Sequence, residues 1–332
     1  MHEIRTMIKI YDLSKAPYSF KHASYGGLNG SKDGIIIHGE EWMVKYPQNL
    51  SNIRGEAPSY STSPLSEYLG SHIYKTLGYD VHKTILGIRN DKLVVACKDF
   101  AVNEKMLLEI RTIKNSYNRE LDDILLSNRI SSTDSHIVDI DELMIHLDKN
   151  PVLSSIPGLK QRFFEQAIVD IFIANTDRNN GNWGIIREKN NPDIIAPVFD
   201  NGNSFLPKAS DDKIECLSQD VEMINNSTNI LTAYGKGWHH FSAKVFLEYF
   251  EKDHCFQDAI FKTVPLIQNK RNDILRLIEE IPERAVLENG KDISVMSRAR
   301  KEYYIKQMDI RIERLLKPEK ERVLKLRERG KN

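Results

Sequence analysis

The segment FIANTDRNNGNWGII, residues 172–186, constrains this chain more than any other part of its sequence. It begins as an apolar, helix-like stretch, continues as a polar turn and ends with the apolar character of a strand. The turn carries Asp177 and, five residues later, Asn182. After a second turn, the apolar run IIAPVFD ends at Asp200. The sequence therefore predicts a helix, a polar loop and a β-hairpin that carries a second aspartate at its end.

An aspartate, an asparagine and a second aspartate in this order are typical of phosphoryl transfer. Asp177 would accept the proton of an attacking hydroxyl group. The amide oxygen of Asn182 and the carboxylate of Asp200 would hold Mg²⁺ on the phosphates of a nucleotide. We therefore expect an enzyme that transfers phosphate, with Asp177, Asn182 and Asp200 as its catalytic residues.

The same loop allows two other interpretations. Asp177, Asn179 and Glu188 stand at the first, third and twelfth positions of a calcium-binding EF-hand loop. Gly181 stands at the fifth position. However, Asn182 occupies the position where that loop needs glycine, and the residues that follow are hairpin-like rather than helical. An ordinary polar turn is the other interpretation, because Asn, Asp and Gly are the commonest turn formers.

A glycine-rich segment, YGGLNGSKDG at residues 25–34, precedes the first strong strand pattern. Backbone amides approach phosphates closely where side chains are absent, so the segment suits a nucleotide loop. We expect Gly27, Gly30 and Ser31 to bind ATP. The spacing matches no common phosphate-loop pattern, and a flexible hairpin turn explains the glycines equally well.

Lys45 ends the next strand-like run and is placed to meet the α- and β-phosphates of ATP. Such a lysine needs an anionic partner, and Glu67 on the following helical pattern is the nearest candidate. Two surface charges are the alternative, and a surface pair would contribute little. Further along, an adenine edge could bond backbone groups from Lys98 to Phe100. A buried strand followed by a loop would produce the same pattern there.

The distribution of patterns along the 332 residues predicts an α+β protein with two lobes. Strand patterns (residues 34–46, 83–90 and 92–100) fill the first hundred residues, with one helical pattern at 64–78. Helical patterns dominate after Met106 (residues 107–127, 136–147, 159–175, 240–250, 258–267 and 272–281). We therefore expect a sheet-rich lobe at 1–100, a helical lobe at 101–332, and the nucleotide in a cleft at their junction.

Composition excludes several classes of protein. Forty-seven basic and 47 acidic residues cancel, so net charge gives no case for nucleic-acid or stable membrane binding. Three widely spaced cysteines suggest reduced thiols rather than disulfides. No conventional secretory signal and no membrane-spanning run is visible, which predicts a cytoplasmic protein, with export by another route left open.

The C-terminal region is basic. Residues 298–331 contain thirteen Lys or Arg and six Asp or Glu, and their pattern predicts two amphipathic helices split at Pro318. The default interpretation is that these basic side chains lie on helix faces exposed to solvent. An acidic partner, a nucleic acid or a nuclear import signal are the alternatives.

The motifs NTDRNNGN and PVFDNGNS resemble those of the HipA-like kinases, bacterial Ser/Thr kinases related in fold to phosphatidylinositol kinases. Within that family the chain looks closest to the short, stand-alone, cell-translocating type. The resemblance, over about residues 20–280, implies the roles given above for the two aspartates, Asn182, Lys45 and Glu67. The family commonly has histidine where this chain has Asn179. The way in which side chains support this loop is therefore expected to depart from the family pattern.

The resemblance also implies regulation and partners. Family members phosphorylate themselves near the nucleotide, and the segment SYSTSP offers four hydroxyl groups at Ser59, Ser61, Thr62 and Ser63. A linker with a helix N-cap explains that segment equally well. Family members are also often toxins neutralised by a DNA-binding antitoxin, so an antitoxin or a host protein is a candidate partner.

The sequence thus predicts a kinase that uses ATP and Mg²⁺ to phosphorylate Ser or Thr of proteins, including itself. A phosphoinositide or small-molecule kinase is the first alternative. The stretch after Asp200 has four acids and two lysines, which disfavours a membrane-facing substrate. The second alternative is a nucleotide-binding regulator without turnover.

Overall fold

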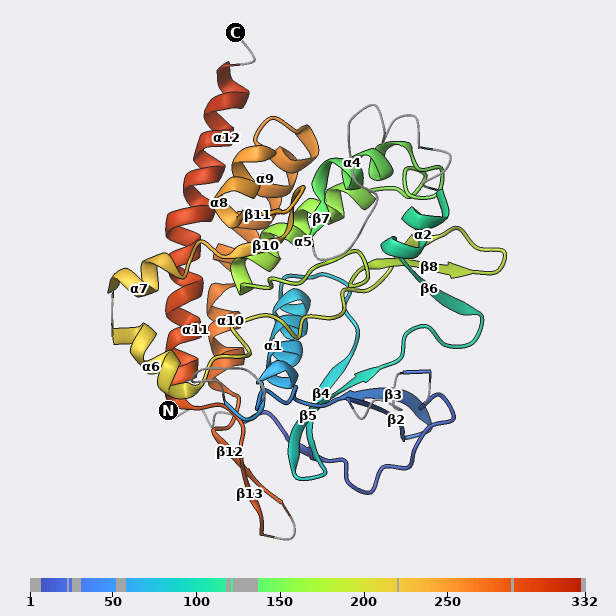
Figure 1. Ribbon diagram of the computed structural model, residues 1–332, viewed down its shortest axis with the longest axis vertical. Helices are drawn as coiled ribbons and strands as arrows, with labels where there is room; N and C mark the ends of the chain where they lie inside the picture. Colours follow the sequence, from blue (N-terminus) through green and yellow to red (C-terminus); the bar gives the residue numbers. More distant parts are fainter. Residues whose placement is uncertain are drawn as a thin grey trace. The chain divides into compact units, whose positions relative to one another are not determined.

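The computed structural model describes residues 7–22, 24–25, 31–51, 58–117, 121, 137–219, 221–287 and 290–329. Two compact units are present (Figure 1). The first comprises residues 1–100, 201–224 and 270–307, and the second comprises 101–200, 225–269 and 308–332. The boundary after residue 100 was expected. The predicted lobes at 1–100 and 101–332 differ from these units, because two later segments belong to the first unit.

The first unit is built on a five-stranded sheet with strand order β1-β4-β5-β3-β2. Its strands are β1 (Tyr11–Asp12), β2 (Lys32–Ile37), β3 (Glu40–Lys45), β4 (Thr84–Arg89) and β5 (Lys92–Lys98). A tight turn at His38 and Gly39, both with positive φ, joins β2 to β3. The three strand patterns expected in this region are all present. Apolar side chains from β2, β3 and β5, with Leu13 directly after β1, form the core beside this sheet (Leu13, Ile35, Trp42, Val44, Val94 and Ala96).

Helix α1 (Ser63–Thr76) follows the sheet hairpin and packs on β4 and β5. The face expected to be apolar, Leu65, Leu69, Ile73 and Leu77, is buried. Each such side chain contributes about 1.5–3 kcal/mol when it leaves water. The expected stop at Gly78 has φ +82°, a backbone conformation that favours glycine.

Two later segments complete the first unit. One carries α6 (Asp211–Gln219) and the start of α7 (Val221–Asn226), and the other carries α10 (Arg271–Glu279), β12 (Arg284–Val286), β13 (Asp292–Ser294) and most of α11 (Arg298–Arg311). The backbone N–H of Thr62 donates to Pro207 O at 2.8 Å. The buried Arg300 pairs with Asp211. These contacts are distant in sequence, which explains why the strand and helix patterns alone did not predict them.

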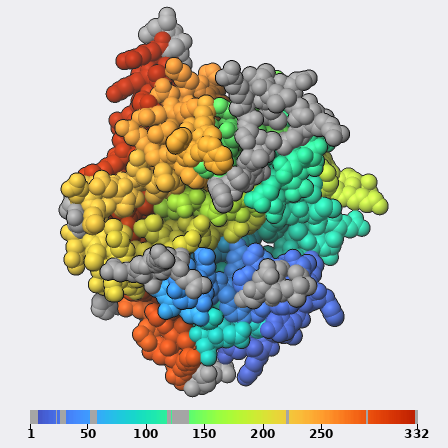
Figure 2. Space-filling model, viewed as in Figure 1, coloured from blue at the N-terminus to red at the C-terminus, as the bar shows by residue number. Residues whose placement is uncertain are grey.

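The second unit holds the expected hairpin within a three-stranded sheet of order β6-β8-β9. Strands β8 (Gly184–Glu188) and β9 (Ile194–Ile195) pair antiparallel, and their connecting turn projects from the surface (Figure 2). A second sheet, of order β11-β10-β7, contains β7 (Val138–Asp139), β10 (Leu231–Lys236) and β11 (His239–Ser242). Its helices before residue 270 are α2 (Ile110–Tyr117), α4 (Ile140–Lys149), α5 (Leu159–Ile173), α8 (Ala243–Tyr249) and α9 (His254–Asn269), and its C-terminal segment is helical as well.

Three predicted helices of this unit begin as strands instead. Strand β6 (Lys105–Glu109) precedes α2, while β7 precedes α4 and β11 precedes α8. Each short strand finds a partner far away in the chain, as β6 does in β8. Tertiary pairing of this kind overrides local helical periodicity.

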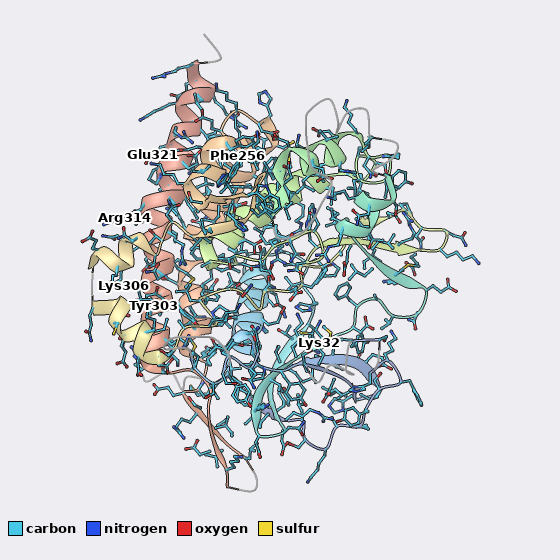
Figure 3. All side chains as sticks on the ribbon, viewed as in Figure 1. Lys32, Phe256, Tyr303, Lys306, Arg314 and Glu321 are labelled. Atoms are coloured by element: carbon cyan, nitrogen blue, oxygen red, sulfur yellow. The ribbon has the colours of Figure 1, made fainter. Side chains whose placement is uncertain are left out.

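The predicted break at Pro318 is absent. Helix α11, the π-helical turn η3 (Ile312–Leu316) and α12 (Lys317–Arg329) follow one another directly, and Figure 3 shows Lys306, Arg314 and Glu321 along this helix. A proline lacks an N–H and crowds the preceding turn, and the wider π turn accommodates it. The basic residues Arg300, Lys301 and Arg311 are buried, so this region is not simply a solvated basic face.

Within the described part of the chain, no helix is both long enough and apolar enough to cross a membrane.

Candidate active site

The loop after α5 positions Asp177 in the second unit. Helix α5 ends at Ala174, which has φ +54°, and Asn175 then donates its side-chain amide to Asp170 at 3.1 Å. The oxygen of Asn175 accepts the backbone N–H of Asp177 at 3.3 Å. Asp177 itself is exposed. The buried end of the helix thus presents a solvent-accessible carboxylate, as a proton acceptor requires.

Asn179, at the position where the family commonly has histidine, supports Asp177. Its amide nitrogen donates to the Asp177 carboxylate at 3.0 Å. Its oxygen accepts from Arg111 at 2.8 Å and from the backbone N–H of Gly181 at 2.9 Å. An asparagine therefore orients the carboxylate directly from within the loop.

A buried arginine that the sequence analysis did not single out organises this loop. Arg178 forms a two-bond pair with Asp170, at 2.8 and 3.0 Å. Its third nitrogen donates to the carbonyl groups of Asn182 at 2.9 Å, Phe199 at 2.5 Å and Asp200 at 3.3 Å. One guanidinium therefore brings the segments of both predicted metal ligands together. A lone aspartate, Asp170, within the apolar run AIVDIFIA was the available signal in the sequence.

The donor set suits Mg²⁺. Asn182 uses its amide nitrogen within the loop, where it donates to Asp177 O at 2.5 Å, and its oxygen is the atom that can bind a metal. Asp200 adds a carboxylate from a left-handed residue, φ +58°, that lies five residues beyond the end of β9. Oxygen ligands from an amide and a carboxylate are those that Mg²⁺ prefers. The EF-hand interpretation is wrong, because Glu188 lies in β8 rather than at the start of a helix.

The Lys45–Glu67 pair is present in the first unit. Lys45 Nζ lies 2.8 Å from Glu67 Oε2, and the Glu67 side chain is fully buried. Burial favours the neutral form of Glu67, but the Lys45 ammonium and a hydrogen bond from His82 outweigh it and hold the pKa of Glu67 below its usual range. The carboxylate therefore stays charged and fixes the ammonium. Two surface charges are not the explanation of this pair.

Glu67, His82 and the thiol of Cys97 also lie close enough to surround a metal ion. His82 and Glu67 are already bonded to each other, and Lys45 supplies the positive charge. An ion pair with its hydrogen-bonded support explains this cluster without a metal.

The structure supports the other predicted nucleotide contacts less directly. Gly27 and Gly30 lie outside the described residues, and Ser31 is exposed and directly precedes β2. The N–H of Lys98 bonds Lys83 O, while the N–H of the next residue bonds Glu41 O. An adenine edge would therefore have to bond other groups of the segment that ends at Phe100.

The four predicted phosphorylation hydroxyls differ in exposure. Ser59 is exposed, whereas Ser61 is buried and accepts the N–H of Gln48 at 2.9 Å. Ser61 also shares a hydrogen bond with Ser63 at 2.8 Å. Thr62 donates its hydroxyl to Pro207 O at 3.3 Å. In this conformation Ser59 is the hydroxyl most accessible to another molecule.

No family model matches the chain. The serine/threonine-protein kinase CtkA of Helicobacter pylori is 31% identical over 202 residues, which are 60% of this chain and 58% of CtkA. The chain is homologous to CtkA. The alignment spans somewhat less than two thirds of the length of CtkA.

Solved structures agree on the fold. The crystal structure of the H. pylori proinflammatory kinase CtkA matches 96% of this chain and 99% of its own, with a TM-score of 0.75 and 23% identity. HipA from Shewanella oneidensis, solved with HipB and operator DNA, matches 97% of this chain and 70% of its own, with a TM-score of 0.52 and 13% identity. The predicted α+β, kinase-like fold is confirmed.

Proposed function

We propose that this protein is a serine/threonine protein kinase that uses Mg-ATP. The loop organised by Arg178 is the observation that supports this most, because one buried guanidinium bonds the backbone carbonyls of Asn182 and Asp200 directly beside the exposed carboxylate of Asp177. The homology to CtkA supports the same reaction. Lys45, oriented by Glu67, would bind the nucleotide phosphates.

The reaction requires little covalent chemistry from the protein. The hydroxyl oxygen of a substrate Ser or Thr attacks the γ-phosphorus, ADP leaves, and Asp177 accepts the hydroxyl proton. Mg²⁺, bound by Asn182 and Asp200, would neutralise the phosphate charge. Lys45 and Asp177 therefore contribute mainly by positioning and by charge.

Incubation of the protein with radiolabelled ATP and cell extract, followed by phosphosite mapping, tests the proposal. Label should appear on Ser or Thr of proteins. Asp200→Ala should abolish it, and Asp177→Asn should keep ATP binding while transfer falls by at least ~10². Normal transfer by both variants would contradict the site, and ATP binding without transfer by the wild type would favour a nucleotide-binding regulator.

We also propose autophosphorylation between Ser59 and Ser63. A phosphate adds roughly −1.5 to −2 charges at neutral pH. On this segment, which immediately precedes the helix that carries Glu67, that charge would weaken ATP binding and limit activity. Mass spectrometry after incubation with Mg-ATP should find the phosphate on wild-type protein, with Ser59 as the exposed site, and not on Asp200→Ala. Phosphate found only elsewhere would contradict this.

An antitoxin-like protein or a host protein is the proposed partner. Phosphosite mapping in bacterial and in host extracts separates these two sources by the identity of the labelled protein. Label confined to lipid would instead favour the phosphoinositide kinase alternative.

A further inference from the structure

The Glu67 carboxylate binds donors from three other parts of the first unit. Oε2 accepts from Lys45 at 2.8 Å. Oε1 accepts from His82 Nε2 at 3.0 Å and from the backbone N–H of Asn201 at 3.1 Å. The carboxylate is buried, so water does not readily replace a lost donor. A shift of this one group would disturb all three partners.

Asn201 matters because it directly follows Asp200, the proposed metal ligand. Its side-chain amide donates to Ser71 Oγ at 3.0 Å, and Ser71 Oγ lies 3.1 Å from His82 Nε2. Glu67, His82, Ser71 and Asn201 thus form one hydrogen-bonded cluster, and all four are buried. Within this cluster the backbone N–H beside the proposed metal ligand bonds directly to the carboxylate that orients the lysine.

Gly70 makes room for Asn201 in this cluster. A Cβ atom at Gly70 would lie 2.6 Å from the Cβ of Asn201. Such a contact would force one of the two backbones to move. The close approach of α1 to the segment after Asp200 therefore depends on a residue without a side chain.

The hydrogen on His82 is fixed by its partner. An ionised carboxylate can only accept, so Nε2 must carry the hydrogen that bonds Glu67, and Ser71 Oγ can only share that hydrogen as a second acceptor. The ring of His82 also packs against Phe100 edge to face, with 6.4 Å between centroids. His82 is thereby held with its donor directed at Glu67.

We propose that His82 is a positioning residue that couples the phosphate-binding Lys45 to the metal-binding segment through Glu67. The inference rests on the proposed kinase function. When His82 donates to Glu67, one carboxylate holds both the ammonium and the N–H beside Asp200. Without that donor, Glu67 can still pair with Lys45, but its second oxygen is no longer oriented for Asn201. The metal-dependent part of nucleotide binding should then weaken.

Three variants of the full chain test this. His82→Leu removes the donor, and His82→Gln places an amide donor at a similar distance from the backbone. His72→Gln is the matched control, because His72 lies on the same helix as Glu67 but bonds Tyr68 O instead. The measurements are kcat, the KM for ATP, the Mg²⁺ concentration at half-maximal rate, Tm, and binding of a fluorescent ATP analogue with and without Mg²⁺.

His82→Leu should lower kcat/KM for ATP by about 10- to 100-fold, the loss expected for a hydrogen bond to a charged group. It should also raise the Mg²⁺ concentration that gives half the maximal rate. His82→Gln should restore most of the lost kcat/KM and most of the wild-type response to Mg²⁺. His72→Gln should resemble the wild type in both measurements. If His82→Leu changes only Tm, or if a folded His82→Gln is as defective as His82→Leu, the proposal is wrong.

The analogue measurements separate this inference from the kinase proposal. If the wild type binds nucleotide with Mg²⁺ but transfers no phosphate, the kinase proposal fails. The coupling is then still supported if His82→Leu loses the Mg²⁺-dependent gain in affinity, and overturned if it keeps that gain.

Discussion

At the scale of single residues, Arg178 illustrates how one side chain organises a reactive loop. Its planar guanidinium offers five N–H donors, and it uses them on both Asp170 oxygens and on three backbone carbonyl groups. A lysine would carry the same charge but could not span these partners. The exposed carboxylate of Asp177 therefore depends on a buried neighbour that need not touch substrate.

Arg178→Ala should reduce the free energy of unfolding by about 3–5 kcal/mol, because it leaves Asp170 buried without its counter-ion. Urea titration followed by tryptophan fluorescence would measure this. Arg187→Ala is the control, since Arg187 pairs with Asp193 at the surface, where such pairs contribute about 1 kcal/mol or less. Equal losses in the two variants would contradict the role given to Arg178.

A second residue-scale prediction concerns the Lys45–Glu67 pair. Lys45→Ala should weaken binding of a fluorescent ATP analogue, and Glu67→Ala should cause a milder loss of the same kind. The double variant should lose less than the sum, because the two residues act as one unit. Lys75→Ala, on the exposed side of α1, should bind as the wild type does. If the losses of binding in the two single variants add up to that of the double variant, Lys45 acts as an independent charge and the prediction is wrong.

At the scale of elements, α1 links the sheet of the first unit to the segment after Asp200. Its apolar face packs against β4 and β5, while Ser66 donates to Ser204 O at 2.7 Å. His72 lies on the same helix, stacked on Tyr68 with 3.9 Å between ring centroids. This histidine titrates within the helix that carries Glu67, so its protonation is expected to affect the stability of this part of the unit.

Burial lowers the pKa of His72, although its bond to Tyr68 O opposes the shift and Lys75 adds to it. Above the ordinary histidine pKa the side chain is neutral in the folded and the unfolded state, so it does not make the free energy of unfolding depend on pH. As pH falls through that value, the unfolded chain binds the proton first, so stability should decrease. We expect His72→Gln to remove up to ~1.4 kcal/mol per pH unit of this slope. Urea titrations of both proteins at pH 7.5 and 5.5 would measure it, and equal slopes would contradict the prediction.

At the scale of the whole molecule, the chain forms its first unit from three separated segments. Glu67, Ser66 and Thr62 each bond the segment 201–224, and Arg300 bonds Asp211 within the later segments. Helix α10 also packs on α1. The first hundred residues are therefore an incomplete unit.

A fragment of residues 1–100 should not fold cooperatively on its own. It would expose the apolar surface that α10 covers and would leave the buried Glu67 without the N–H of Asn201. Thermal unfolding followed by circular dichroism should show a broad transition, whereas the full chain should unfold in one or more sharp steps. A sharp transition of the fragment would show that the predicted lobe 1–100 is independent.

The sequence by itself determined the elements that local pattern controls. Apolar spacing located α1, α5, β4 and β5, because burial of one face requires that periodicity. The polar turn at 175–183 located Asp177 and Asn182, and the order of charged residues suggested the pairing of Lys45 with Glu67. Each of these predictions rests on a pattern that neighbouring residues form by themselves, either regular apolar spacing or a particular order of polar and charged residues.

The tertiary structure decided everything that depends on partners distant in the chain. Strand β6 exists because β8 pairs with it, and Arg300 is buried because Asp211 meets it. The sequence alone does not single out Arg178 or His82, and only their buried bonds to Asp170 and Glu67 show which groups they contact. Local periodicity carries no information about which distant groups meet, since that depends on how all the packed surfaces fit together.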